Sequence, residues 1–211
     1  MLRRLGLLIL AFVLAGCGAG AIQTTPDDVL TVGGLKPNVK DKDAGLVAIA
    51  PGFDLKKYKL IAVEKFPVTD PAVKDEDDRR FVAKMSPVFQ VELVRRLRDS
   101  KLFEHVVNTS EIQQPKPGSQ VLRLEGVITR LGRGDRALRM WVGGGAGAAR
   151  AQAELRFVDA ASGQVVMATA DRRIAKVGGS STELVEESFD DMARDLAKFL
   201  IRLSKGEAPK D

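Results

Sequence analysis

Arginine and glycine residues gather in one stretch of the chain, between residues 130 and 150. Arginines recur at every third position from Arg130 to Arg139, and the one tryptophan, Trp141, lies beside them. A basic surface with an aromatic side chain can bind an anionic polymer, a lipid head group or an acidic protein. An ordinary solvated loop is the alternative. The candidate partner contacts are Arg133, Arg136, Arg139, Trp141 and Arg150.

A run of glycines follows the arginines, at Gly143-Gly144-Gly145-Ala146-Gly147. A phosphate-binding loop needs lysine and a hydroxyl residue after its last glycine, but Ala148 and Ala149 follow here. A dinucleotide-binding loop leads from a strand into a helix, whereas this run precedes a predicted strand. Because glycine has no Cβ, another backbone can approach it closely. We therefore expect no nucleotide cofactor and name as close-approach candidates Gly143, Gly144, Gly145 and Gly147.

The residue types that hydrolysis or metal binding needs are sparse. The chain has one histidine, His105, and one cysteine, Cys17, which are too few for a His/Cys zinc site. A Gly-x-Ser-x-Gly nucleophile motif is absent. Asp135 and Asp159 could act as an acid–base pair, but Asp159 is better explained by a turn. We expect no catalytic residue, no metal and no enzymatic activity.

The first 17 residues have the three-part layout of an export signal. Arg3 and Arg4 precede an apolar run, and Leu14-Ala15-Gly16-Cys17 matches the bacterial lipobox. The run Leu5–Ala15 is about half of the roughly 20 residues that a membrane-spanning helix needs. We predict cleavage before Cys17, which would carry a diacylglycerol and an N-acyl chain such as palmitate. A secretory signal with an accidental cysteine, or a buried helix, is the alternative.

The predicted anchor also predicts a location. Gly18 follows the cysteine, where an aspartate would retain a Gram-negative lipoprotein in the inner membrane. We expect the outer membrane, with the domain facing the periplasm and an envelope protein or anionic polymer as partner. A net charge of +5 is too modest to indicate nucleic-acid binding in that compartment.

Hydrophobic periodicity predicts one α/β (α+β) domain over residues 58–205. Apolar residues on both faces of Tyr58–Phe66 predict a central strand, and a four-residue apolar spacing predicts a helix over 75–98. Pro87 would either kink this helix or restart it with Ser86 as cap. The strand, helix and following strand predict a parallel unit, and the last two strands predict a hairpin. The further strands are expected at 102–107, 119–131, 151–158 and 164–174, and a last helix at 181–204.

The expected order is therefore β-α-β-β-β-β-α, a mixed sheet of four to five strands with two helices packed on it. Outside this domain we expect a signal peptide over 1–16 and a short frayed tail over 206–211. Gly, Pro, Asp and Lys are frequent in residues 17–57, which predicts a flexible tether with an r.m.s. span of about 35 Å. Residues 46–50 could form a short edge strand within it.

Three motifs carry a resemblance to a known family. They are Gly134-x-Arg136-Ala137-Leu138-Arg139, Gly143-Gly144-Gly145-Ala146-Gly147 and Phe157-Val158-Asp159-Ala160-x-Ser162-Gly163-x-Val165-Val166. With a looser match from Tyr58 to about Leu203, the chain resembles bacterial lipoproteins with the domain of unknown function DUF4410. Typical members carry an aromatic residue at the position of Gly144 and threonine at that of Ser162.

The resemblance implies no catalytic residue and no established activity. It implies a fold similar to the α/β domains of curli-secretion and penicillin-binding-protein-activator lipoproteins, which is an analogy of fold and does not specify function. We expect an outer-membrane lipoprotein that binds or scaffolds an envelope partner without catalysis. A subunit of an oligomeric export or assembly complex is the alternative, and an enzyme acting on cell-wall or lipid substrates is a third.

Overall fold

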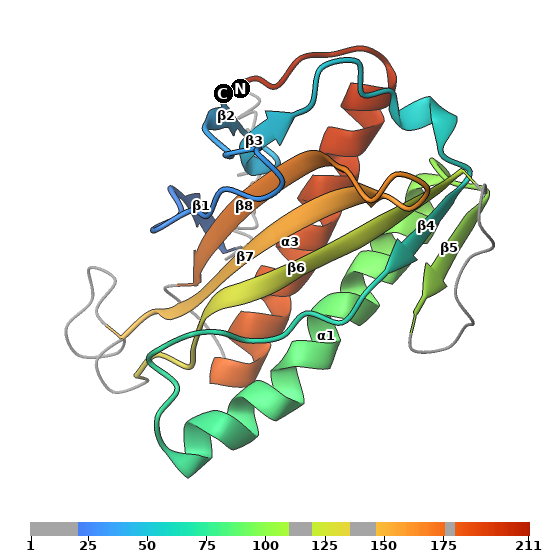
Figure 1. Cartoon of the computed structure of the whole chain (residues 1–211). Coiled ribbons are helices and arrows are strands. Elements are labelled where there is room, and N and C mark those ends of the chain that lie inside the picture. Colours follow the sequence, from blue (N-terminus) through green and yellow to red (C-terminus); the bar gives the residue numbers. More distant parts are fainter. Residues whose placement is uncertain (1–20, 110–119, 136–146, 176–179) are drawn as a thin grey trace, which may run out of the picture.

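The computed structural model describes residues 21–109, 120–135, 147–175 and 180–211. An eight-stranded mixed sheet carries two long helices, α1 and α3, on one of its faces (Figure 1). The strand order is β2-β3-β8-β7-β6-β4-β5, and β1 also pairs with β8. The α+β class and the two packed helices are confirmed, whereas the sheet has eight strands instead of four to five. Within the described ranges, no helix is both long and apolar enough to cross a bilayer.

The additional strands come from the region in which we expect a tether. Their bounds are β1 Ile22–Thr24, β2 Val39–Asp41 and β3 Gly45–Ile49. Both β1 and β3 pair antiparallel with β8, and β2 pairs with β3. The flexible tether over 17–57 is therefore wrong from residue 21 onward. The strand expected over 46–50 exists, but β2 covers its outer side, so it is not an edge strand.

The predicted parallel unit is confirmed. It consists of β4 Leu60–Val63, α1 Glu76–Ser100 and β5 His105–Asn108, with β4 and β5 parallel. The strand β4 also pairs in parallel with β6, so it is flanked on both sides as its apolar sequence predicts. His105 is exposed at the start of β5. The helix continues through Pro87 without restarting, and Ser86 donates its hydroxyl to the carbonyl of Phe66 instead of capping a new helix.

Three long antiparallel strands form the middle of the sheet: β6 Val121–Gly132, β7 Ala149–Asp159 and β8 Val165–Ala175. The predicted turn joins the last two. The Asp159 carboxylate accepts hydrogen bonds from the backbone N–H groups of Ala161 and Ser162, and Gly163 adopts a φ of 71°. The hairpin is therefore confirmed, and its turn uses Asp159 as the sequence predicts.

The last helix, α3 Ser181–Ser204, begins with the predicted capping box of Ser180 and Glu183. It packs against α1 and the sheet, where Phe89 of α1 lies 4.8 Å from Phe189 of α3 between ring centroids. The core lies between the helices and the sheet. The C-terminal tail is not frayed. The N–H of Lys210 donates to the Asp41 carboxylate, and the carbonyl of Lys210 accepts from the N–H of Lys42.

Candidate functional site

The structure describes three arginines of the predicted contact segment, Arg130, Arg133 and Arg150. Arg133 lies 2.7 Å from Asp78 in the first turn of α1, measured from Nη2 to Oδ1. Arg130 lies 3.4 Å from Asp28, on the N-terminal segment. Arg150 is exposed on β7, opposite Ile174 of β8. Arg130 and Arg150 lie on the paired strands β6 and β7, where Arg130 is opposite Gln152 and Arg150 is opposite Gly132. The remaining contact candidates lie outside the described residues: Arg136, Arg139 and Trp141.

The two ends of the glycine-rich segment meet where β6 ends and β7 begins. The N–H of Asp135 donates to the carbonyl of Gly147 over 2.8 Å. A Cβ on Gly134, whose φ is 66°, would lie 2.2 Å from that same oxygen. The close approach at Gly147 is therefore made by the backbone next to Gly134. The other close-approach candidates, Gly143, Gly144 and Gly145, lie outside the described residues, and so does Cys17.

The two aspartates considered as an acid–base pair lie far apart. Asp135 adjoins the start of β7 and Asp159 ends it, so an 11-residue strand of about 37 Å separates them. Asp159 accepts a 2.8 Å hydrogen bond from the Tyr58 hydroxyl. Backbone hydrogen bonding from Ser162 lowers the pKa of Asp159, and burial together with Asp159 raises the pKa of Tyr58 to about 12. These two groups stabilise the turn.

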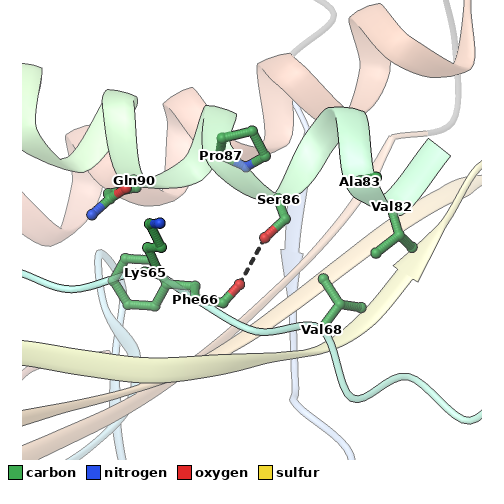
Figure 2. A pocket seen from close by; sticks show the side chains of 8 residues that line it. All are labelled: Lys65, Phe66, Val68, Val82, Ala83, Ser86, Pro87 and Gln90. Atoms are coloured by element: carbon green, nitrogen blue, oxygen red, sulfur yellow. Dashed lines mark hydrogen bonds between the residues drawn. The ribbon is translucent and has the colours of Figure 1, made fainter. Parts of the chain in front are cut away.

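An open groove lies between α1 and the segment that follows β4 (Figure 2). Its volume is about 410 Å³. A hydrogen bond of 2.8 Å from Ser86 to the carbonyl of Phe66 bridges its two walls. In Figure 2, Val68 and Val82 point toward each other on one side of this bond, and Lys65 lies on the other side near Gln90. The lining residues are Lys65, Phe66, Val68, Val82, Ala83, Ser86, Pro87 and Gln90.

Pro87 changes the chemistry of the helical wall. Proline has no N–H, so the carbonyl of Ala83, one turn earlier, lacks its usual intrahelical donor. Both residues are exposed and both line the groove. Gln90 is held in place by donating 2.9 Å and 2.8 Å hydrogen bonds to the Val63 carbonyl and to Asn108. The lining of the groove thus combines apolar side chains with one ammonium group, at Lys65.

Sequence reasoning missed this groove. Pro87 was visible as an irregularity in a helix, but the facing wall at 65–68 approaches α1 only in the folded chain. The residues that line the groove include no histidine, cysteine or carboxylate. Across the described parts of the chain, no three such side chains gather in a way that could hold a metal ion.

A cluster of charged side chains fixes the N-terminal segment to α3. The N–H of Ala21 donates to the Asp191 carboxylate over 3.1 Å. Arg173 of β8 lies between Asp171, at 2.8 Å, and Asp195 of α3, at 3.1 Å. Burial raises the pKa of Asp171, although the Arg173 guanidinium opposes this shift. The cluster therefore holds β8, α3 and the N-terminal segment together through charged side chains that are shielded from solvent.

Arg202 of α3 extends this cluster to β2 and the following turn. Its guanidinium lies 2.7 Å from Asp41 and 2.9 Å from Asp43. Burial would raise the pKa of Asp41, but hydrogen bonds from Arg202 and from nearby backbone N–H groups outweigh burial and lower it. The carboxylate is therefore held in its charged form as a structural tie between β2 and α3.

Comparisons with known proteins identify a family and several solved structures of low similarity. A family model described as "Domain of unknown function (DUF4410)" matches residues 49–179. No curated protein matches the sequence. Among solved structures, a PelC dodecamer from Paraburkholderia phytofirmans is 12% identical, with a TM-score of 0.47 over 72% of this chain and 98% of that one.

Two further solved structures show comparable similarity. XCC0632 from Xanthomonas campestris, assigned to DUF330, is 13% identical, with a TM-score of 0.42 over 78% of this chain and 90% of that one. A protein from Caulobacter crescentus CB15 described as a candidate lipoprotein is 15% identical, with a TM-score of 0.36 over 74% and 96%. At such low identity, we transfer neither an activity nor a partner from these structures.

Proposed function

We propose that this chain, which belongs to the DUF4410 family, is an outer-membrane lipoprotein whose domain binds an envelope partner without catalysing a reaction. The open groove beside α1 carries the binding part of this proposal. Its walls are largely apolar, and Lys65 adds one ammonium group to the lining. The proposed lipid anchor determines the location, because it would hold the domain at the outer membrane, facing the periplasm.

The lipobox and the position of Ala21, four residues after Cys17, support the anchor together. Ala21 already contacts α3, so a functional domain can begin directly behind an acylated cysteine. We expect the mature protein to consist of the acylated Cys17 and this domain.

Mass spectrometry of the purified native protein tests the anchor. We expect the mature N-terminus at Cys17, with the added mass of a diacylglycerol and an N-acyl chain, in the outer-membrane fraction. Cys17→Ser should abolish the added mass, and Ser86→Ala, which leaves the lipobox unchanged, should keep it. A native protein that begins at Met1 and carries no acyl mass would contradict the anchor.

Two arginine substitutions on α1 test the groove. Ala83→Arg places a long charged side chain at the groove, whereas Val91→Arg changes an exposed position two turns along that does not line it. We expect partners crosslinked in intact cells to be lost with Ala83→Arg and retained with Val91→Arg. Equal recovery with both variants would show that the groove is not the binding surface.

The arginine segment is a second candidate contact within the same function. Serine at positions 133, 136 and 139 should reduce recovery of the same partner if the segment contributes to binding. Arg133→Ser alone is the structural control, because Arg133 pairs with Asp78 and its loss affects the domain itself. Unchanged recovery with the triple variant would remove the segment from the proposal.

One observation also favours the alternative of an oligomeric export or assembly subunit. Among the described strands, β5 pairs with β4 alone, so its outer side is an edge that a second chain could extend. Light scattering of the acylated protein in detergent distinguishes the two functions. A mass of one chain would support the binding module, and a mass of several chains, as a closed ring would have, would support the assembly.

A further inference from the structure

The N-terminal segment is held in place at Ala21, four residues after Cys17. Ala21 is 9% exposed, and its N–H is bonded to Asp191 of α3. The next residues form β1, which pairs in register with residues 172–174 of β8. The Gln23 side chain donates to the Asp43 carbonyl, at the turn between β2 and β3. The anchored end of the chain therefore joins the sheet beside β1 and the β2–β3 turn.

The chain between Cys17 and Ala21 is short compared with the width of the sheet. Four residues span at most about 14 Å even when fully extended. From β1 to β5 the path crosses β8, β7, β6 and β4, and five spacings of about 4.8 Å give roughly 24 Å. If the β5 edge rested on the bilayer, Ala21 would lie farther from the surface than this chain can reach.

We propose that the acylated protein rests on the membrane with the β1/β2 edge of its sheet, and that the β5 edge and the groove face away. This inference rests on the proposed acylation of Cys17. The groove lies between α1 and the residues after β4, which is the strand next to β5. Figure 1 shows β1 and β2 on the side of the sheet opposite to β5. The short connection thus presents the groove to partners in the periplasm.

The side chains at the β1/β2 edge suit a lipid surface. Ile22 of β1 and Val39 of β2 are 50% and 49% exposed, which is unusual for large apolar residues of this domain. Lys40 and Lys42 follow Val39 in the chain; 63% and 52% of their side chains are exposed, and they pair with Asp211 and Asp43. Exposed apolar residues beside lysines favour contact with the head groups of an anionic bilayer.

Single introduced cysteines can measure this orientation. Lys42→Cys lies at the proposed membrane edge and Glu104→Cys lies beside β5. Glu104 belongs to an exposed ion pair with Lys59, and Lys42 is half-exposed and pairs with the buried Asp43. Cys17 is the one native cysteine, and acylation blocks its thiol, so a fluorophore would label the introduced position alone. The acylated variants are placed in vesicles of phosphatidylethanolamine and phosphatidylglycerol that contain lipids with a nitroxide quencher on the head group.

We expect quenching at position 42 to be severalfold stronger than at position 104. A flexible Gly/Ser insertion of about 20 residues between Gly20 and Ala21 adds an r.m.s. span of about 25 Å and should abolish this difference. Unchanged thermal unfolding of the two labelled variants controls for their folding.

The outcomes separate this inference from the proposed function. If the acyl mass is present but both labels are quenched equally, or position 104 more strongly, the orientation is refuted while the anchor stands. If no acyl mass is found, the anchor fails first, and the orientation fails with it. If the long insertion leaves the difference unchanged, something other than the short connection holds the domain, and the geometric argument is refuted.

Discussion

Replacing Arg173 with methionine should strongly destabilise the domain. The Arg173 side chain is 5% exposed and lies within 2.8 Å of Asp171 and 3.1 Å of Asp195, which are each 11% exposed. Methionine fills a similar volume but leaves both carboxylates without this cation. Breaking a buried ion pair by removing one partner costs about 3–5 kcal/mol. Since a domain has a total unfolding free energy of about 5–15 kcal/mol, the loss should be plain in a urea titration.

The loss should also depend on pH in a defined direction. Burial raises the pKa of Asp171 above its ordinary value of 3.8, and Arg173 opposes this shift, so the pKa should rise further in Arg173→Met. A carboxyl with a raised pKa stabilises the fold when protonated, below its unfolded pKa, and this contribution is lost as the pH rises through the folded pKa. The deficit of the variant in unfolding free energy should therefore grow between about pH 4 and pH 7.

Two further variants test the reasoning. Arg194→Met removes an arginine of α3 that is 39% exposed, and solvent screening should limit its cost to about 1 kcal/mol. Asp171→Asn in the Arg173→Met background removes one unpaired charge and should restore part of the stability. Circular dichroism during urea unfolding at both pH values measures the unfolding free energy of each variant. A loss below about 1 kcal/mol for Arg173→Met, or a loss independent of pH, would refute the claim that Arg173 stabilises the fold by pairing with these buried side chains.

Three other substitutions test local features by the same urea unfolding. Tyr58→Phe removes the 2.8 Å hydrogen bond to Asp159 and should cost about 1–2 kcal/mol at neutral pH. Gly134→Ala places a Cβ against the carbonyl of Gly147 at a φ of 66° and should cost about 1–3 kcal/mol. Ser180→Ala removes the N-cap of α3 and should cost about 0.5–2 kcal/mol.

Matched controls accompany these three. Gly132→Ala should be nearly neutral, because a Cβ there meets no atom within 4 Å, and equal losses at positions 132 and 134 would contradict the close approach. Ser181→Ala follows the cap and should change stability less than Ser180→Ala. Tyr58→Phe should add little to Asp159→Asn, and a fully additive loss would show that the two groups act independently.

The core order of the fold could be predicted because its signals are local. The spacing of apolar residues in 75–98 and 181–204, and the capping box at Ser180, specify two helices without reference to the rest of the chain. The short strands β1 and β2 carry too few alternating positions to stand out among Gly, Pro, Asp and Lys, and of the three N-terminal strands the sequence indicates only β3, through the apolar residues 46–50. They form because β8 offers a free edge, and the sequence of residues 22–49 does not show that edge.

The candidate site was harder to predict. An arginine at every third position allows several arrangements, and the choice for Arg133 depends on Asp78, which lies 55 residues away in the sequence. The groove depends on two walls that meet only after α1 has packed beneath β4. Its one sequence signal, Pro87, predicts an irregular helix equally well when nothing binds there.

By itself, the sequence determined the order of the core elements and the turn at Asp159, because both depend on short-range periodicity and turn chemistry. The lipobox is also a property of the sequence, and acylation of Cys17 stays a prediction. Only the tertiary structure decided where the N-terminal segment lies and how short its connection to Cys17 is. The reason is that backbone hydrogen bonds between strands, such as those of β1 with β8, join residues about 150 positions apart, and no local pattern specifies them.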